Sequence, residues 1–69
     1  MTVNKQDGTL RENIQIGFTV EVVQKNHQRT GELTQGVVKR LLTKAAKHTH
    51  GIKVELYDGV VGRVKRVLL

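Results

Sequence analysis

The chain has 69 residues, no cysteine and a formal net charge of +6 at pH 7. This length is enough for one small domain with a thin core, and the lack of cysteine excludes disulfides and thiolate metal sites. The charge is uneven: residues 1–35 carry four cations and four anions, whereas residues 36–69 carry eight cations and two anions. Such a basic field is typical of a domain with a phosphate-rich partner, although the same charges can simply keep a protein soluble.

The N-terminal residues give a first expectation of domain organisation and location. Residues 1–8 are polar and end in glycine, which predicts a flexible tail followed by a single domain over residues 9–69. Thr9 and Glu12 have capping-box spacing, so one helical turn is possible at residues 10–14. Residues 1–17 contain no signal-peptide-like run, and no segment resembles a membrane span. We therefore expect a soluble cytoplasmic protein.

Two segments of the chain are near copies of each other. Residues 36–42 are Gly-Val-Val-Lys-Arg-Leu-Leu and residues 62–68 are Gly-Arg-Val-Lys-Arg-Val-Leu, and residues 17–22 parallel residues 51–56. Each copy has the pattern of a strand, a connection and a second strand, which predicts two β-hairpins of the same design. Because such a unit cannot bury its apolar face alone, the two hairpins are expected to pack as a small all-β barrel or sandwich. The residues predicted to be buried are Phe18, Val20, Val22, Val38, Ile52, Val54, Leu56 and Val64.

The apolar alternation breaks at the same point of both copies. Val38 and Leu41 are three residues apart, as are Val64 and Val67, whereas a regular strand repeats every two. The break predicts a bulge or sharp bend at the Lys-Arg pair between them, as where barrels turn corners.

The second copy has a tight turn whose length follows from side-chain parity. A two-residue loop at Asp58-Gly59 would place Arg63 on the core face, whereas a three-residue loop over residues 57–59 keeps that face apolar. We therefore predict a type I turn with a glycine bulge and Gly59 in the left-handed region. In this register Lys53, Arg63 and Lys65 share the outer face.

Short motifs resemble those of one family of small bacterial proteins, and together they cover nearly all of the chain after about residue 11. They are Gln28-Arg29-Thr30-Gly31, Leu33-Thr34 with Gly36, Leu42-Thr43, His48-Thr49-His50-Gly51-Ile52-Lys53-Val54, and Gly59 with Gly62-Arg63-Val64. This combination resembles the YwbE family, whose members have no assigned function. The resemblance implies a small SH3-like, KOW-like barrel and implies no established activity.

The basic residues of the second half are the main candidates for a binding site. They are Lys39, Lys53, Arg63 and Lys65, flanked by Lys44 and Lys47. Lysine and arginine neutralise phosphates without reading sequence, and small KOW-like barrels commonly bind RNA through strand faces and loops. With Phe18 expected in the core, Tyr57 is the one aromatic left for base stacking. We therefore predict an accessory module that binds the phosphates and shape of a structured RNA or ribonucleoprotein, with little base reading.

The connection at residues 24–35 is a second candidate. It is much longer than its counterpart in the other copy, and Leu33 is its large apolar residue, expected to pin it to the body. Arg29, beside a glycine and a hydroxyl, could hold a phosphate, but the same side chains could equally bond the loop's own backbone. The alternative function is a protein-interaction adaptor that uses this loop and an exposed strand edge.

Metal binding and catalysis have little support in the sequence. His48-Thr49-His50 could chelate a metal, but structural zinc takes four ligands and no carboxylate or cysteine is near in sequence, so a loop-capping histidine bonded to a backbone carbonyl is favoured. The chain has no serine or cysteine nucleophile and no convergent carboxylates. We predict no metal, no cofactor and no enzymatic activity.

Overall fold

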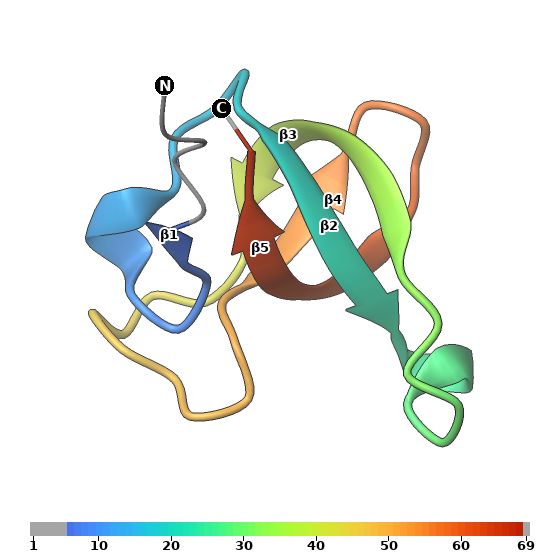
Figure 1. Cartoon of the computed structure of the whole chain (residues 1–69). Coiled ribbons are helices and arrows are strands. Elements are labelled where there is room, and N and C mark those ends of the chain that lie inside the picture. The colour runs from blue at the N-terminus through green and yellow to red at the C-terminus, as the bar shows by residue number, and fades with distance from the viewer. Residues whose placement is uncertain (1–5, 69) are drawn as a thin grey trace, which may run out of the picture.

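The computed structural model describes residues 6–68, and its regular secondary structure consists of β-strands and two short 3-10 turns (Figure 1). Its elements in chain order are β1 (Gln6–Asp7), the 3-10 turn η1 (Arg11–Asn13), β2 (Thr19–Gln24), the 3-10 turn η2 (Lys25–His27), β3 (Thr34–Leu41), β4 (Lys53–Leu56) and β5 (Val61–Val67). Within these described residues, no helix is long and apolar enough to cross a membrane.

Strands β2 to β5 form a closed antiparallel barrel. Their order is β5-β2-β3-β4, and β4 pairs back with β5 to complete the ring. The hairpins β2–β3 and β4–β5 are its two halves, and β1 continues the sheet beside the last residues of β5. The predicted all-β fold, a small SH3-like barrel built from two repeated hairpins, is confirmed.

Each half of the barrel contains a bulge at the predicted position. In β3 the pairing with β4 skips Lys39, and in β5 the pairing with β2 skips Lys65. The extra residue reverses side-chain parity, which keeps Val67 inside the barrel and turns Leu41 toward the core. The equivalence of the two bulges confirms that the sequence repeat is a structural repeat.

The turn between β4 and β5 has the predicted register. Val54 pairs with Gly62, and the backbone N–H of Leu56 donates to the carbonyl of Val60 at 2.7 Å. Gly59 has φ of +92°, in the region where side chains other than glycine are strained. This register places Lys53 directly opposite Arg63 on the outer face.

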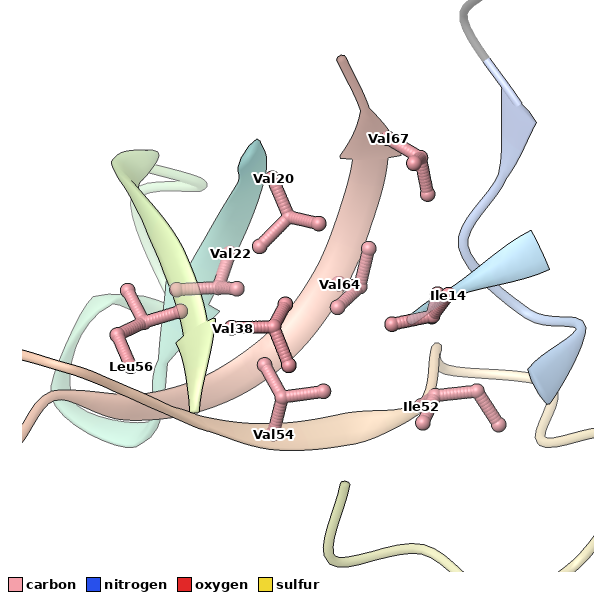
Figure 2. Close-up of a cluster of buried hydrophobic side chains, with 9 residues drawn as sticks. All are labelled: Ile14, Val20, Val22, Val38, Ile52, Val54, Leu56, Val64 and Val67. Carbon is pink, nitrogen blue, oxygen red and sulfur yellow. The ribbon is translucent and has the colours of Figure 1, made fainter. Parts of the chain in front are cut away.

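The barrel interior is filled by branched aliphatic side chains (Figure 2). The buried cluster consists of Ile14, Val20, Val22, Val38, Ile52, Val54, Leu56, Val64 and Val67. Phe18 was expected in this cluster but is only half-buried and packs against it from outside. It precedes β2, where the chain is entering the barrel, so that only part of its ring reaches the core.

The N-terminal segment differs from its prediction. Residues 1–5 lie outside the described part of the chain, but the tail prediction is wrong for residues 6–8, because β1 pairs with β5 and Gly8 is buried and bonded to Ile52. A single turn does form at η1, yet its cap residue is Leu10 and no side chain caps it. No capping box forms, because the turn begins after Leu10, one residue later than Thr9, and the hydroxyl of Thr9 is bonded to Asp7.

Candidate nucleic-acid interface

An open groove lies on the outer face of β2, β4 and β5, below the loop that contains η2. It contains two adjoining hollows of about 560 and 480 Å³, and Arg63 lines both of them. We call the larger one the His50 hollow, which is lined by Val23, Gln28, Gly31, His50, Arg63 and Lys65. We call the other the Val61 hollow, which is lined by Val23, Lys25, Gln28, Lys53, Val61, Gly62 and Arg63. Hollows of this size accommodate ligands as large as a nucleotide.

Two of the groove's cations are oriented by backbone carbonyls. Arg63 donates from Nη1 to the carbonyl of Gly51 at 3.2 Å, and Lys65 donates from Nζ to the carbonyl of His50 at 3.2 Å. Both carbonyls belong to the loop that precedes β4, so this loop holds the two side chains side by side. A neutral carbonyl orients a cation without cancelling its charge, which leaves that charge available to an anion.

Among the described residues that line the groove, several are positively charged and none is negatively charged. Its lining includes the side chains of Lys25, Lys53, Arg63 and Lys65, and no aspartate or glutamate. Within the described chain, two carboxylates form ion pairs outside the groove: Glu55 with Arg40 at 3.1 Å and Glu21 with Arg66 at 3.7 Å. Glu32 lies 3.9 Å from the ring of His27.

The floor of the groove is Val23, which the sequence analysis missed. Its neighbour Val22 points into the barrel, so Val23 points outward, yet it is only 6% exposed. Val23 is paired with Arg63 across the β2–β5 ladder. Val23 and Gln28 each line the two hollows. The sequence did contain a signal for this residue: Val22 and Val23 are consecutive valines near the end of an otherwise alternating strand. Two apolar residues in a row indicate that both faces of the strand are covered at that point.

The loop above the groove is shorter and placed differently than expected. It covers residues 25–33, because β2 extends to Gln24 and β3 begins at Thr34. Leu33, expected to pin it, is 40% exposed. Arg29 is exposed and does not line the groove, whereas Gln28 and Gly31 do.

The structure brings together only part of the predicted basic surface. Lys53, Arg63 and Lys65 line the groove as expected. Lys39 is on β3, which faces β5 across the barrel and is separated from it by β2 and β4. The basic residues predicted from the sequence therefore do not form one strand face.

The remaining predicted residues lie outside the groove's lining. Lys47 forms an isolated bridge with Leu10, and its charge acts on Asp7. Lys44 is exposed in the same connection. Tyr57 is 62% exposed at the β4–β5 turn, where its backbone N–H donates to Val37 at 3.0 Å.

The two neighbouring histidines shape the loop beside the His50 hollow. Nδ1 of His48 accepts a hydrogen bond from the backbone N–H of His50 at 3.2 Å, so His48 does cap the loop, although its partner is an N–H and not the expected carbonyl. Partial desolvation lowers the pKa of His48, and the charges of Arg63 and His50 lower it further. Among residues 6–68 no group of three or more histidine, aspartate or glutamate side chains is placed to hold a metal.

Comparison with known proteins identifies relatives of the chain. Residues 7–67 match the model of the family described as uncharacterized conserved protein DUF2196. The chain is also 47% identical over 62 residues to "Uncharacterized protein YwbE" of Bacillus subtilis (strain 168). The aligned segment covers 90% of this chain and 95% of that protein. The chain belongs to the YwbE family. No solved structure matched the chain.

The extent of the family match agrees with the structure. The YwbE family model begins at residue 7, within β1, and ends at residue 67, the last residue of β5. It therefore includes the N-terminal segment, which the motif resemblance, starting near residue 11, did not cover. In this chain, residues 7–10 therefore belong both to the matched region and to the folded domain.

Proposed function

We propose that this YwbE-family protein binds structured RNA, holding phosphate groups in the basic groove. The observation that carries the proposal is the lining of the groove, which includes Lys25, Lys53, Arg63 and Lys65 and no carboxylate. Phosphates meeting such a surface release counterions, and this release favours binding whatever the base sequence. The proposed activity is binding without catalysis, in the cytoplasm, where structured RNA is abundant.

The geometry of the cations supports a phosphate ligand. Arg63 and Lys65 line the same hollow and are each oriented by a backbone carbonyl, so they offer two neighbouring anchor points rather than one diffuse charge. Lys53 lies opposite Arg63 in the ladder and extends the row across β4. Such a row of cations suits a polymer with regularly spaced phosphates better than it suits a single small anion.

The adaptor alternative is less well supported. It requires a strand edge on which a partner could add a strand. Each of β2 to β5 has a neighbouring strand on both sides, but β3 pairs with β2 over residues 34–37 and with β4 over residues 38–41, so the unpaired edges among the described strands are short. A short edge offers few backbone groups to a partner.

A salt-dependent titration tests the proposal. A structured RNA fragment is added to the purified protein at low and moderate salt, and backbone amide shifts are followed. Shifts are expected on residues 23–31, 50–53 and 61–65, and binding should weaken steeply as salt rises. The double variant Lys53→Glu/Arg63→Glu should abolish binding, and Lys53→Ala should flatten the salt slope by about one unit.

The matched control is Lys39→Glu/Lys44→Glu, which makes the same change in net charge outside the groove. This variant should weaken binding much less than the groove variant. Equal losses for the two double variants would show that net charge alone drives the association. Shifts confined to residues 6–19, or no binding at low salt, would overturn the RNA proposal and favour a protein partner.

A further inference from the structure

The two hollows of the groove differ in chemistry. The His50 hollow brings together the cations Arg63 and Lys65 beside His50. The Val61 hollow is lined by the cations Lys25, Lys53 and Arg63. It is also lined by Val61, which is 37% exposed and does not line the His50 hollow. Both hollows therefore suit a phosphate, but only the Val61 hollow adds an exposed apolar side chain against which a flat, partly apolar group can pack.

Arg63 and Gln28 are shared by both hollows. Arg63 is held by the carbonyl of Gly51, so its planar guanidinium has a preferred position between the hollows. The side-chain amide of Gln28 offers both a donor and an acceptor, and within residues 6–68 it makes none of the side-chain hydrogen bonds found. Unpaired bases are recognised by stacking on aromatic rings or arginine planes and by hydrogen bonds to their edges.

We propose that the groove seats one unpaired nucleotide of the bound RNA. Its base lies in the Val61 hollow, stacked on the guanidinium of Arg63 and bonded to the amide of Gln28, and its phosphate lies in the His50 hollow against Lys65. No aromatic residue lines either hollow, so Arg63 supplies the stacking plane. This inference rests on the proposed function and adds to it the class of RNA: a helix interrupted by a bulge or loop, rather than a continuous duplex.

The physical reason for this preference is shape. The phosphates of a continuous duplex lie on its convex outside, with the bases stacked inside, so a duplex can contact the cations but cannot fill the Val61 hollow. An unpaired nucleotide can turn out of the helix at a low cost in lost stacking and pairing. It then buries apolar surface on Val61 in addition to the phosphate contacts.

The test compares two RNAs on one set of variants. One RNA is a hairpin with a single bulged nucleotide, and the other is a fully paired duplex of equal charge. The wild-type chain should bind the bulged RNA more tightly than the duplex. Arg63→Lys keeps the charge and loses the plane, so it should lose about fivefold or more in affinity for the bulged RNA, with little change for the duplex or in the salt slope.

Gln28→Ala should show the same selectivity, and it provides a second test should Arg63→Lys lower the thermal stability of the fold. The matched controls are Arg40→Lys and Gln35→Ala, which make the same changes on β3 outside the groove. The methyl signals of Val61 should shift with the bulged RNA and not with the duplex, while those of Val37 on β3 should not shift.

The possible results separate this inference from the proposed function. The proposal of a seated nucleotide would be overturned if the wild-type chain bound the two RNAs with equal affinity. It would also be overturned if Arg63→Lys and Gln28→Ala each lost the same affinity for the duplex as for the bulged RNA. Either result would leave the proposed backbone binding in place. No binding of either RNA at low salt would overturn both.

Discussion

Asp7 and Thr9 form a tightly bonded unit at the start of the described chain. One carboxylate oxygen of Asp7 accepts hydrogen bonds from the hydroxyl of Thr9 at 2.6 Å and from its backbone N–H at 2.8 Å. These bonds, with a smaller contribution from the charge of Lys47, hold the pKa of Asp7 below its ordinary value of 3.8. Since the ionised carboxylate is the form that accepts these bonds, ionisation of Asp7 favours the folded segment.

Thr9→Ala removes the hydroxyl bond, so the pKa of Asp7 should rise toward 3.8. Because the folded pKa lies below the unfolded one, the contribution of Asp7 to stability is complete above about pH 4 and is lost as the pH falls through the folded value. The stability difference between wild type and Thr9→Ala should therefore shrink on the acid side. Carboxyl NMR titration measures the pKa, with Thr30→Ala as the control. An unchanged pKa in Thr9→Ala would show that the hydroxyl bond is not formed in solution.

At the scale of an element, the β4–β5 hairpin depends on the conformation of its turn. Asp58 accepts a hydrogen bond from the backbone N–H of Val60 at 3.1 Å, and Gly59 donates to the carbonyl of Leu56 at 2.9 Å. A Cβ added at Gly59 would meet nothing within 4 Å, so the cost of a substitution there is backbone strain alone. This turn sets the register that aligns Lys53 with Arg63, and so links a local conformation to the groove.

Gly59→Val should destabilise the domain by about 1–2 kcal/mol, because a β-branched residue is strained at positive φ. Chemical denaturation measures the change. Gly59→Asn is the matched control and should cost much less, since asparagine enters the left-handed region more readily. If valine and asparagine cost the same, the turn has a conformation other than the one described.

At the scale of the whole molecule, the N-terminal segment completes the barrel. Figure 2 shows Ile14 beside Ile52 and Val64 at one end of the buried cluster. The segment is tied down further by hydrogen bonds from Arg11 to Ala46 and from His48 to Thr9, both at 2.9 Å. A closed barrel this small has few side chains per layer, so a residue that fills one end contributes a large share of the core.

Ile14→Ala should destabilise the domain by about 2–5 kcal/mol, as expected for a large-to-small change in a core. Ile16→Ala is the matched control: it makes the same change two residues later, where the side chain is 61% exposed, and should stay within about 0.5 kcal/mol of wild type. Thermal or chemical unfolding measures both. Similar small effects of the two variants would mean that the segment does not pack on the barrel.

Features that depend on neighbouring residues could be predicted from the sequence. The strand period of two, its break at Val38–Leu41 and at Val64–Val67, and the Asp58-Gly59 turn together predicted the hairpins, the bulges and the register. These determine which face each strand residue occupies. The shared position of Lys53, Arg63 and Lys65 on one outer face followed from that parity alone.

The groove itself was decided by tertiary structure. Gln28 and His50 come to lie on either side of the Arg63–Lys65 row because two loops distant in sequence fold over β5, and no local periodicity encodes that approach. Ring closure separates Lys39 from Lys65, although the two occupy equivalent positions in the repeat. Parity assigns a side chain to the inside or outside of a barrel, but where it lies around the ring depends on which strands pair to close it.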